Sequence, residues 1–244
     1  LSKKVSKNKH GQSLGRKGRE TRQRLMDAAR ELLQSSSPTQ LTVVAIAKKA
    51  RSSSATFYLY FEDVRGLLLV LSEEAEAGMK VVHEVLDEPW DPQFLDLDHA
   101  ARVVEAYVSV WDKHREVLRY RNLEADRGDA EFENIRLRTI VRIVSRFAEH
   151  IFAAYPEDTN FTYTDAMAEA SVLAAAMERL AATDMEAVNR GVGPEAMWDG
   201  MTRIIARTLN ADAAGAVGKK RSPAKRTGKK STKPKSRTAR KAAS

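Results

Sequence analysis

The sequence predicts an all-α protein, with a small three-helix unit near the N-terminus and a larger helical body behind it. Apolar residues recur every three to four positions along most of the chain, as they do on one face of an α-helix. Capping and turn residues divide these stretches into helix-sized segments, and no stretch alternates as a β-strand does. At 244 residues the chain is long enough for two domains.

The chain is predicted to begin with a disordered basic arm at residues 1–18. These residues are polar, basic and rich in glycine, so they bury too little apolar surface to offset the entropy of ordering them. The first helix follows and ends at the Ser-Ser-Ser-Pro segment 35–38. Its apolar face consists of Leu25, Ala28, Ala29, Leu32 and Leu33.

Two short helices complete the small unit. Thr42 is placed to cap the first of them, because its hydroxyl can accept a hydrogen bond from a free N–H of the first turn. Ser53 is placed to cap the second, in which Phe57 and Phe61 lie four residues apart and face the core. Residues 19–65 are therefore predicted to form a helix-turn-helix domain.

A connecting helix is predicted from the N-cap Asp63 to about His83. The body is predicted to span residues 66–212, so most of the connecting helix belongs to it. The chain after residue 212 becomes a low-complexity mixture of Lys, Arg, Ser, Thr, Ala, Pro and Gly, so residues 213–244 are predicted to be a disordered basic tail. Turn signals divide the body into five further helices at about 96–112, 114–126, 129–154, 163–187 and 194–210.

The last two helices are predicted to form the interface of a homodimer. The first is rich in alanine and methionine, and the second carries Met197, Met201, Ile204 and Ile205 on one stripe. Small side chains allow close approach of neighbouring helices, and two such helices per chain can form a four-helix seam with their symmetry mates. The alternative, that both helices complete the core of a single chain, stays open.

The charge distribution indicates a polyanionic partner. The formal net charge is +8, but Lys219 to Lys241 contribute +12 and residues 1–24 contribute +8, which leaves −12 for residues 25–218. Clustered cations bind a phosphate backbone strongly because they release its condensed counterions. Nucleic acid is the expected partner of the two ends.

Several classes of protein are disfavoured. Without cysteine there is no disulfide framework or thiolate metal site, no nucleophile–base–orienter set is evident, and isolated histidines do not make a metal site. We therefore expect no enzyme activity, no cofactor and no metal. No apolar run reaches the ~20 residues of a membrane span and no secretory signal is evident, so a cytoplasmic, nucleoid-associated location is expected.

One segment carries a specific resemblance. Residues 41–61 read LTVVAIAKKARSSSATFYLYF, which is a capped helix, a tight turn and a Thr-Phe-Tyr-x-Tyr-Phe helix. This segment closely resembles the DNA-binding signature of the tetracycline-repressor (TetR) family, and with the flanking helices the resemblance covers about residues 20–71. A short helix held by such a turn can enter the major groove of DNA while its predecessor crosses the backbone.

The resemblance implies specific DNA contacts. In the family, residues at the positions of Thr42 and Tyr60 bind phosphates, and residues at the positions of Ser54, Ala55, Thr56 and Tyr58 lie at base edges. Arg51 stands where most relatives have glycine in the turn, and we interpret it as a further phosphate contact. The predicted DNA-binding residues are Thr42, Arg51, Ser53, Ser54, Ala55, Thr56, Tyr58, Tyr60, Arg16 and Lys17.

The body is expected to hold a small apolar or amphipathic effector. The predicted pocket residues are Tyr107, Trp111, Tyr120, Phe147, Met177 and Glu178, for each of which ordinary core packing is the alternative. Glu178 shares its helix face with small apolar residues, and two roles stay open for it. It anchors a polar group of the ligand, or it pairs with an arginine across the dimer.

Taken together, these features predict a sequence-specific transcriptional regulator. The main hypothesis is a homodimeric repressor that binds a pseudo-palindromic double-stranded DNA operator and is released by a small-molecule effector. The alternative is a nucleoid-associated protein that binds DNA without sequence preference through its basic ends.

Overall fold

The protein is all-helical in the parts that the structure describes. The computed structural model describes residues 13–35, 41–155, 160–183 and 185–211, and these ranges contain helices and no β-strand. The predicted all-α fold is therefore confirmed. The predicted tail at 213–244, and the predicted arm up to residue 12, lie outside the described residues.

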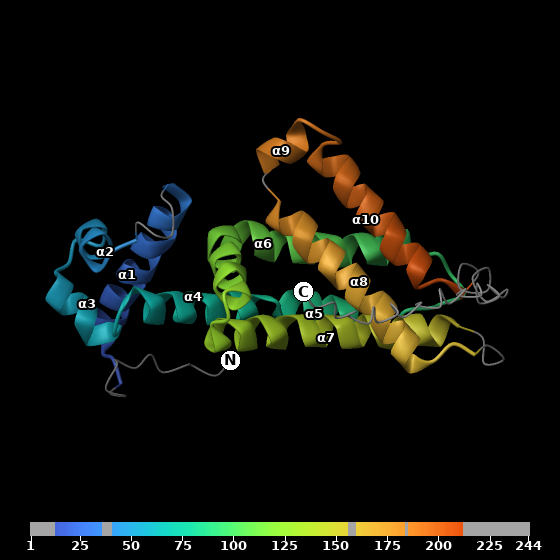
Figure 1. Cartoon of the computed structure of the whole chain (residues 1–244), viewed down its shortest axis with the longest axis horizontal. Helices are drawn as coiled ribbons and strands as arrows, with labels where there is room; N and C mark the ends of the chain where they lie inside the picture. Colours follow the sequence, from blue (N-terminus) through green and yellow to red (C-terminus); the bar gives the residue numbers. More distant parts are fainter. Residues whose placement is uncertain (1–12, 36–40, 156–159, 184, 212–244) are drawn as a thin grey trace, which may run out of the picture.

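Three helices form a head at one end of the elongated molecule (Figure 1). They are α1 (Arg16–Ser35), α2 (Val43–Lys49) and α3 (Ser54–Tyr60). Helix α1 begins at Arg16, so its first turn uses residues that the sequence assigns to the basic arm. The core of the head includes the buried side chains Leu25, Met26, Ala29, Leu33, Ile46, Phe57 and Phe61.

The predicted N-caps of three helices are confirmed. Thr42 caps α2, Ser53 caps α3 and Asp63 caps the following helix, and each side-chain oxygen accepts a hydrogen bond from the backbone N–H three residues later. The donor–acceptor distances are 3.2, 3.1 and 2.7 Å in that order. These bonds satisfy first-turn N–H groups that have no partner within the helix.

The connection from head to body consists of two helices, α4 (Val64–Gly78) and α5 (Lys80–Leu86), where the sequence predicts one. The break falls at Met79, whose N–H donates to the carbonyl of Glu76 at 3.0 Å. A Cβ at Gly78 would lie 3.6 Å from Nε2 of His114 on the neighbouring helix. The break therefore packs closely against the body.

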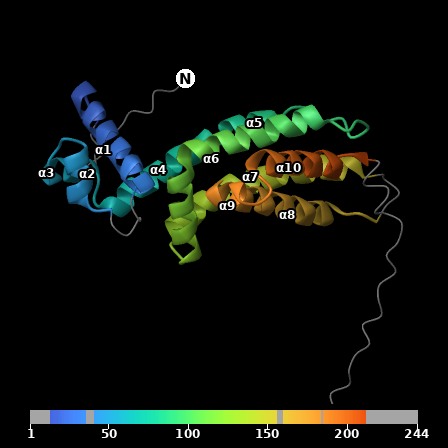
Figure 2. The same cartoon turned by 90° about the horizontal axis from the view of Figure 1, so that it is seen from above.

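The body begins with two long helices, α6 (Leu97–Asp126) and α7 (Ala130–Ala154). Helix α6 is continuous where the sequence predicts two helices, at 96–112 and 114–126. Figures 1 and 2 show, however, that α6 bends, and that its C-terminal part runs across the body on the side of the head. The two predicted segments thus form one bent helix.

Three more helices complete the body: α8 (Tyr163–Ala182), α9 (Met185–Asn189) and α10 (Pro194–Thr208). The predicted helix 163–187 is interrupted after Ala182, and α9 is a separate short helix. The body core includes Tyr107 and Trp111 from α6, Phe147 from α7 and Met177 from α8.

The core of the head extends into the body. Val117, Ala125 and Phe132, from the C-terminal part of α6 and the start of α7, are buried in the same apolar cluster as the head residues, and Tyr120 packs against it. The rings of Tyr120 and Phe132 meet edge to face with centroids 5.5 Å apart. The head therefore rests on the α6–α7 corner through continuous apolar packing.

Ion pairs connect α4 to the same corner. The guanidinium of Arg65, in the first turn of α4, donates to both carboxylate oxygens of Asp129, at 2.7 and 2.8 Å, and also pairs with Glu131 at 2.8 Å. Asp129 is the N-cap of α7, so the arginine joins the start of α4 to the start of α7. These hydrogen bonds raise the pKa of Arg65.

Candidate nucleic-acid interface and body cavity

The turn between α2 and α3 is held by a helix C-cap motif. The N–H of Arg51 donates to the carbonyl of Lys48 at 3.1 Å, and the N–H of Ser52 donates to that of Ala47 at 2.8 Å. This Schellman arrangement places Arg51 in the left-handed region, at φ +52°, where glycine is the usual residue. The turn therefore has the backbone geometry that usually requires glycine, although the residue at this position is Arg51.

Helix α3 has one buried and one exposed face. Phe57 is fully buried, whereas Tyr58 and Leu59 are 45% and 54% exposed. Figure 1 shows α3 at the end of the head that is farthest from the body. The exposed face thus presents an aromatic hydroxyl and an apolar side chain together.

The ten predicted DNA-binding residues all lie in the head. Arg16 and Lys17 are exposed on the first turn of α1, and the other eight lie at the start of α2, in the turn and on α3. A Cβ at Gly18 would lie 3.6 Å from the hydroxyl of Tyr60, so the start of α1 adjoins the end of α3. The structure thus brings the basic start of α1 beside the end of α3.

Two of these residues also serve the structure. The hydroxyls of Ser53 and Thr56 are 2.9 Å apart, within hydrogen-bond distance, while Ser53 also caps α3. This contact orients Thr56 at the start of the helix. A substitution at Ser53 will therefore disturb folding as well as any contact that its hydroxyl makes.

Two exposed apolar residues of the head were not among the predicted contacts. Val44 on α2 is 68% exposed, and Leu59 lies beside Tyr58 on α3. Helical spacing from the buried residues Ile46 and Phe57 is the signal that places both on the outer faces. Apolar side chains in such positions suit contacts with thymine methyl groups.

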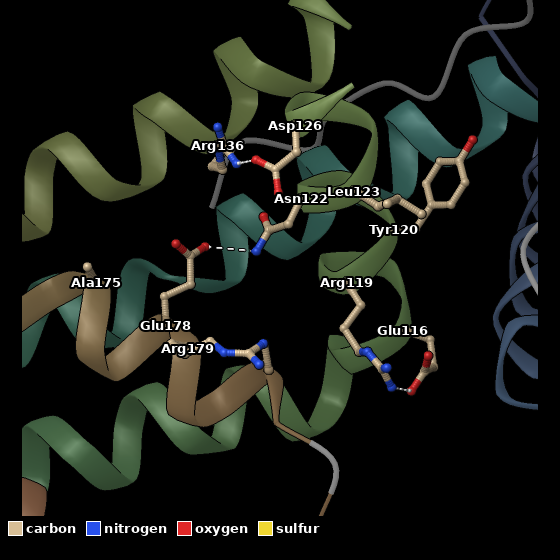
Figure 3. Close-up of a pocket in the computed structure, with 11 residues that line it drawn as sticks. Glu116, Arg119, Tyr120, Asn122, Leu123, Asp126, Arg136, Ala175, Glu178 and Arg179 are labelled. Atoms are coloured by element: carbon tan, nitrogen blue, oxygen red, sulfur yellow. Dashed lines mark hydrogen bonds and ion pairs between the residues drawn. The ribbon is translucent and has the colours of Figure 1, made fainter. Parts of the chain in front are cut away.

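The body contains a cavity of about 550 Å³ between α6, α7 and α8 (Figure 3). A volume of this size is typical of sites for small molecules. Its lining is largely polar and consists of Glu116, Arg119, Tyr120, Asn122, Leu123, Asp126, Arg136, Ala175, Glu178, Arg179 and Ala182.

A buried ion pair supports one wall of this cavity. Nη2 of Arg121, whose side chain is 1% exposed, donates to Oε1 of Glu178 at 3.2 Å, and Nδ2 of Asn122 donates to the same oxygen at 3.0 Å. Burial lowers the pKa of Arg121, and the charge of Glu178 opposes that effect. Glu178 therefore pairs with an arginine of its own chain, which the sequence-based alternatives did not include.

The six predicted pocket residues divide into two groups. Tyr120 and Glu178 line the cavity. The other four are buried in the body core and do not line it: Tyr107, Trp111, Phe147 and Met177. Burial raises the pKa of Tyr107, which keeps its phenol neutral. These large side chains pack in the body core and are therefore not available to contact a ligand in this cavity.

Sequence reasoning missed the polar lining of the cavity. Arg119, Asn122, Arg136 and Arg179 line the cavity but were not among the predicted pocket residues. The available signal was spacing. Arg119 and Asn122 lie three residues apart, on neighbouring turns of a helix, and close to the predicted pocket residue Tyr120, while Arg179 directly follows the predicted pocket residue Glu178. An apolar pocket was expected, so these charges were not considered.

An apolar surface lies between α8 and α10. Val172 is 72% exposed and Ile204 is 52% exposed. Both adjoin a second cavity of about 640 Å³, which is also lined by Leu173, Ala176 and Met201. The structure thus leaves large apolar side chains of both predicted interface helices uncovered in the single chain.

The described ranges contain neither a candidate metal site nor a candidate membrane-spanning helix. No group of three or more His, Asp or Glu residues there is placed to hold a metal ion. None of the helices in the described part of the chain combines the length and apolar character needed to cross a membrane.

Two family descriptions match the sequence. Residues 25–71 match "Bacterial regulatory proteins, tetR family" and residues 84–210 match "Tetracyclin repressor-like, C-terminal domain". The second match alone covers more than half of the chain. No curated protein matches the sequence significantly.

Solved structures share the fold. The fatty acid degradation regulator FadR from Bacillus halodurans is 14% identical with a TM-score of 0.57, covering 81% of this chain and 96% of that one. A TetR-like transcriptional regulator from Rhodococcus sp. RHA1 is 18% identical with a TM-score of 0.57, covering 78% and 95%. The regulatory protein TetR from Rhodobacter sphaeroides is 19% identical with a TM-score of 0.53, covering 77% and 98%. At these identities the similarity shows a common fold.

Proposed function

The chain belongs to the TetR family of DNA-binding transcriptional regulators, and from this premise we propose that it is a homodimeric repressor that a small effector releases from its operator. The proposal has three parts: DNA recognition by α3, dimerisation through α8 and α10, and coupling of the body cavity to the head. Different observations support each part.

DNA recognition is assigned to the exposed face of α3. Tyr58 reads base edges in the major groove, while Thr42 and Tyr60 bind phosphates on either side. Arg16 and Lys17, at the start of α1, add backbone contacts beside Tyr60. The support is that these side chains lie together in the head on α1, α2 and α3, at the end away from the body.

Dimerisation is assigned to α8 and α10. Val172 and Ile204 are exposed in the single chain, and burying them against a second copy removes apolar surface from water. A twofold dimer sets two recognition helices about one DNA turn apart, roughly 34 Å, which implies a pseudo-palindromic operator.

The proposal rests mainly on the position of Tyr120 between the cavity and the head. Tyr120 lines the cavity and also packs against the apolar cluster of the head, where its ring meets that of Phe132. Arg65 ties the start of α4 to Asp129 at the same corner. A ligand that displaces this corner of α6 therefore tilts α4 and changes the distance between the two heads, and so prefers one state over the other.

Selection of DNA from a random duplex library, followed by footprinting, tests this function. We expect an enriched inverted repeat and a bounded protected stretch, which Tyr58→Ala weakens while helix content stays unchanged. Enrichment of no motif, together with diffuse protection, would overturn the proposal. Such a result would support the nucleoid-associated alternative, which no present observation favours.

A further inference from the structure

The arginines that line the body cavity or support its wall differ in their ion pairing. Three of the four arginines at the cavity have carboxylate partners: Arg119 with Glu116 at 3.5 Å, Arg136 with Asp126 at 2.5 Å, and Arg121 with Glu178 at 3.2 Å. The guanidinium of the fourth, Arg179, forms no ion pair or hydrogen bond with any described residue. Within the described part of the chain, Arg179 is therefore the arginine of this set whose charge has no carboxylate partner.

The position of Arg179 makes this charge available to a bound molecule. Figure 3 shows its side chain extending from α8 toward the part of α6 that carries Arg119. Glu178, its neighbour in sequence, points instead toward Asn122. The carboxylate of Glu178 already accepts hydrogen bonds from Arg121 and Asn122, so the buried guanidinium of Arg121 balances part of its negative charge.

Apolar side chains complete the lining. Leu123 and Tyr120 come from α6, and Ala175 and Ala182 come from α8. A molecule that fills the cavity thus meets apolar surface on two helices, the paired charged side chains of the lining, and the guanidinium of Arg179, which has no partner among the described residues. A single guanidinium balances a carboxylate, with one negative charge, better than a phosphate monoester, which carries about −1.5 to −2 at pH 7.

We propose that the cavity binds an amphipathic monocarboxylate whose anionic group pairs with Arg179 and whose apolar part lies against the part of α6 that carries Tyr120 and Leu123. This inference rests on the proposed function and specifies the chemical class of its effector. This contact places the apolar part of the ligand on the segment of α6 from which Tyr120 packs against the head.

Three molecules of one shape test the charge requirement. Octanoate, 1-octanol and octylamine share an alkyl chain and differ in charge, and their binding to the full-length protein is measured by isothermal titration calorimetry. We expect octanoate to bind at least about tenfold more tightly than the other two, since a charge-assisted hydrogen bond distinguishes it. No octanoate binding, or equal binding of octanoate and octanol, would overturn the proposal.

Variants assign the contact to Arg179. Arg179→Gln should weaken octanoate binding about tenfold and leave octanol binding unchanged, and Arg179→Lys should retain part of the preference. The matched control is Arg138→Gln on α7, because Arg138 is also exposed and unpaired among the described residues but does not line this cavity. Equal octanoate affinity of Arg179→Gln and the unsubstituted protein would overturn the assignment.

A separate DNA measurement distinguishes this inference from the proposed function. If octanoate binds in an Arg179-dependent way and the operator complex persists, the ligand class stands and release by this ligand fails. If octanoate does not bind and the protein still selects an operator, the DNA-binding function stands and the ligand class is wrong.

Discussion

Replacement of Arg51 by glycine is expected to stabilise the head. Arg51 has φ +52°, and the N–H groups of Arg51 and Ser52 donate to the carbonyls of Lys48 and Ala47. These bonds hold the residue in the left-handed region, so it does not relax unless the end of α2 breaks. Arg51→Gly removes the Cβ that causes the strain and keeps both hydrogen bonds.

The size of the effect follows from two opposing contributions. A side chain in the left-handed region costs about 1–2 kcal/mol. Glycine loses about 0.5–1 kcal/mol more backbone entropy than alanine on folding. The net gain in the free energy of unfolding is therefore about 0.5–1 kcal/mol, which corresponds to a rise in Tm of about 1–4 °C for a chain of this length.

Thermal unfolding followed by circular dichroism measures this gain. The protein concentration is held fixed, because the stability of a dimer depends on it. Arg51→Ala is the matched control, since it removes the same charge but keeps the Cβ, and it should show no gain from released strain. If Arg51→Gly is no more stable than Arg51→Ala, the strain argument is refuted.

Four further predictions concern DNA binding, assembly and pH. Tyr58→Ala should weaken operator binding by about 1–3 kcal/mol in a gel-shift titration, and unchanged affinity would contradict the role of α3. Ile204→Glu should give monomers in light scattering, whereas Val81→Glu on α5, also an exposed apolar position, should stay dimeric. Burial lowers the pKa of His114 from 6.5 to about 4, so its contribution to stability is present above pH 6.5 and is lost as the pH falls toward 4. The free energy of unfolding in urea should therefore fall about 2 kcal/mol more between pH 7 and pH 5 in the unsubstituted protein than in His114→Gln, and equal slopes would contradict this. Deletion of residues 217–244 removes twelve positive charges and should flatten the salt dependence of DNA binding without changing the preference for operator over random DNA.

The head was predictable because local chemistry determines it. The hydroxyls of Thr42 and Ser53 and the carboxylate of Asp63 cap helices at the predicted positions, and each cap depends only on residues three positions away. Phe57 and Phe61 face the core as their spacing indicates. Interactions within one helical turn can be derived from sequence alone.

The body was less predictable because its details depend on distant contacts. The break at Met79 lies against His114, about 35 residues later in the chain, and no proline marks it. The same holds for the cavity, because the partner of Glu178 is Arg121, on another helix. Arg179 has no ion-pair partner among the described residues, and nothing in the sequence distinguishes it from a paired arginine such as Arg119.

The shared core of head and body also defines what can be exchanged between relatives. A chimera joined near residue 65 would separate the head from Val117, Ala125 and Phe132, which complete its apolar cluster. The transplantable unit is therefore discontinuous in sequence and includes the α6–α7 corner, with Asp129 to pair with Arg65. An engineer who wants this DNA specificity under the control of a different sensor has to graft both segments together, or redesign the acceptor's corner to fit this head.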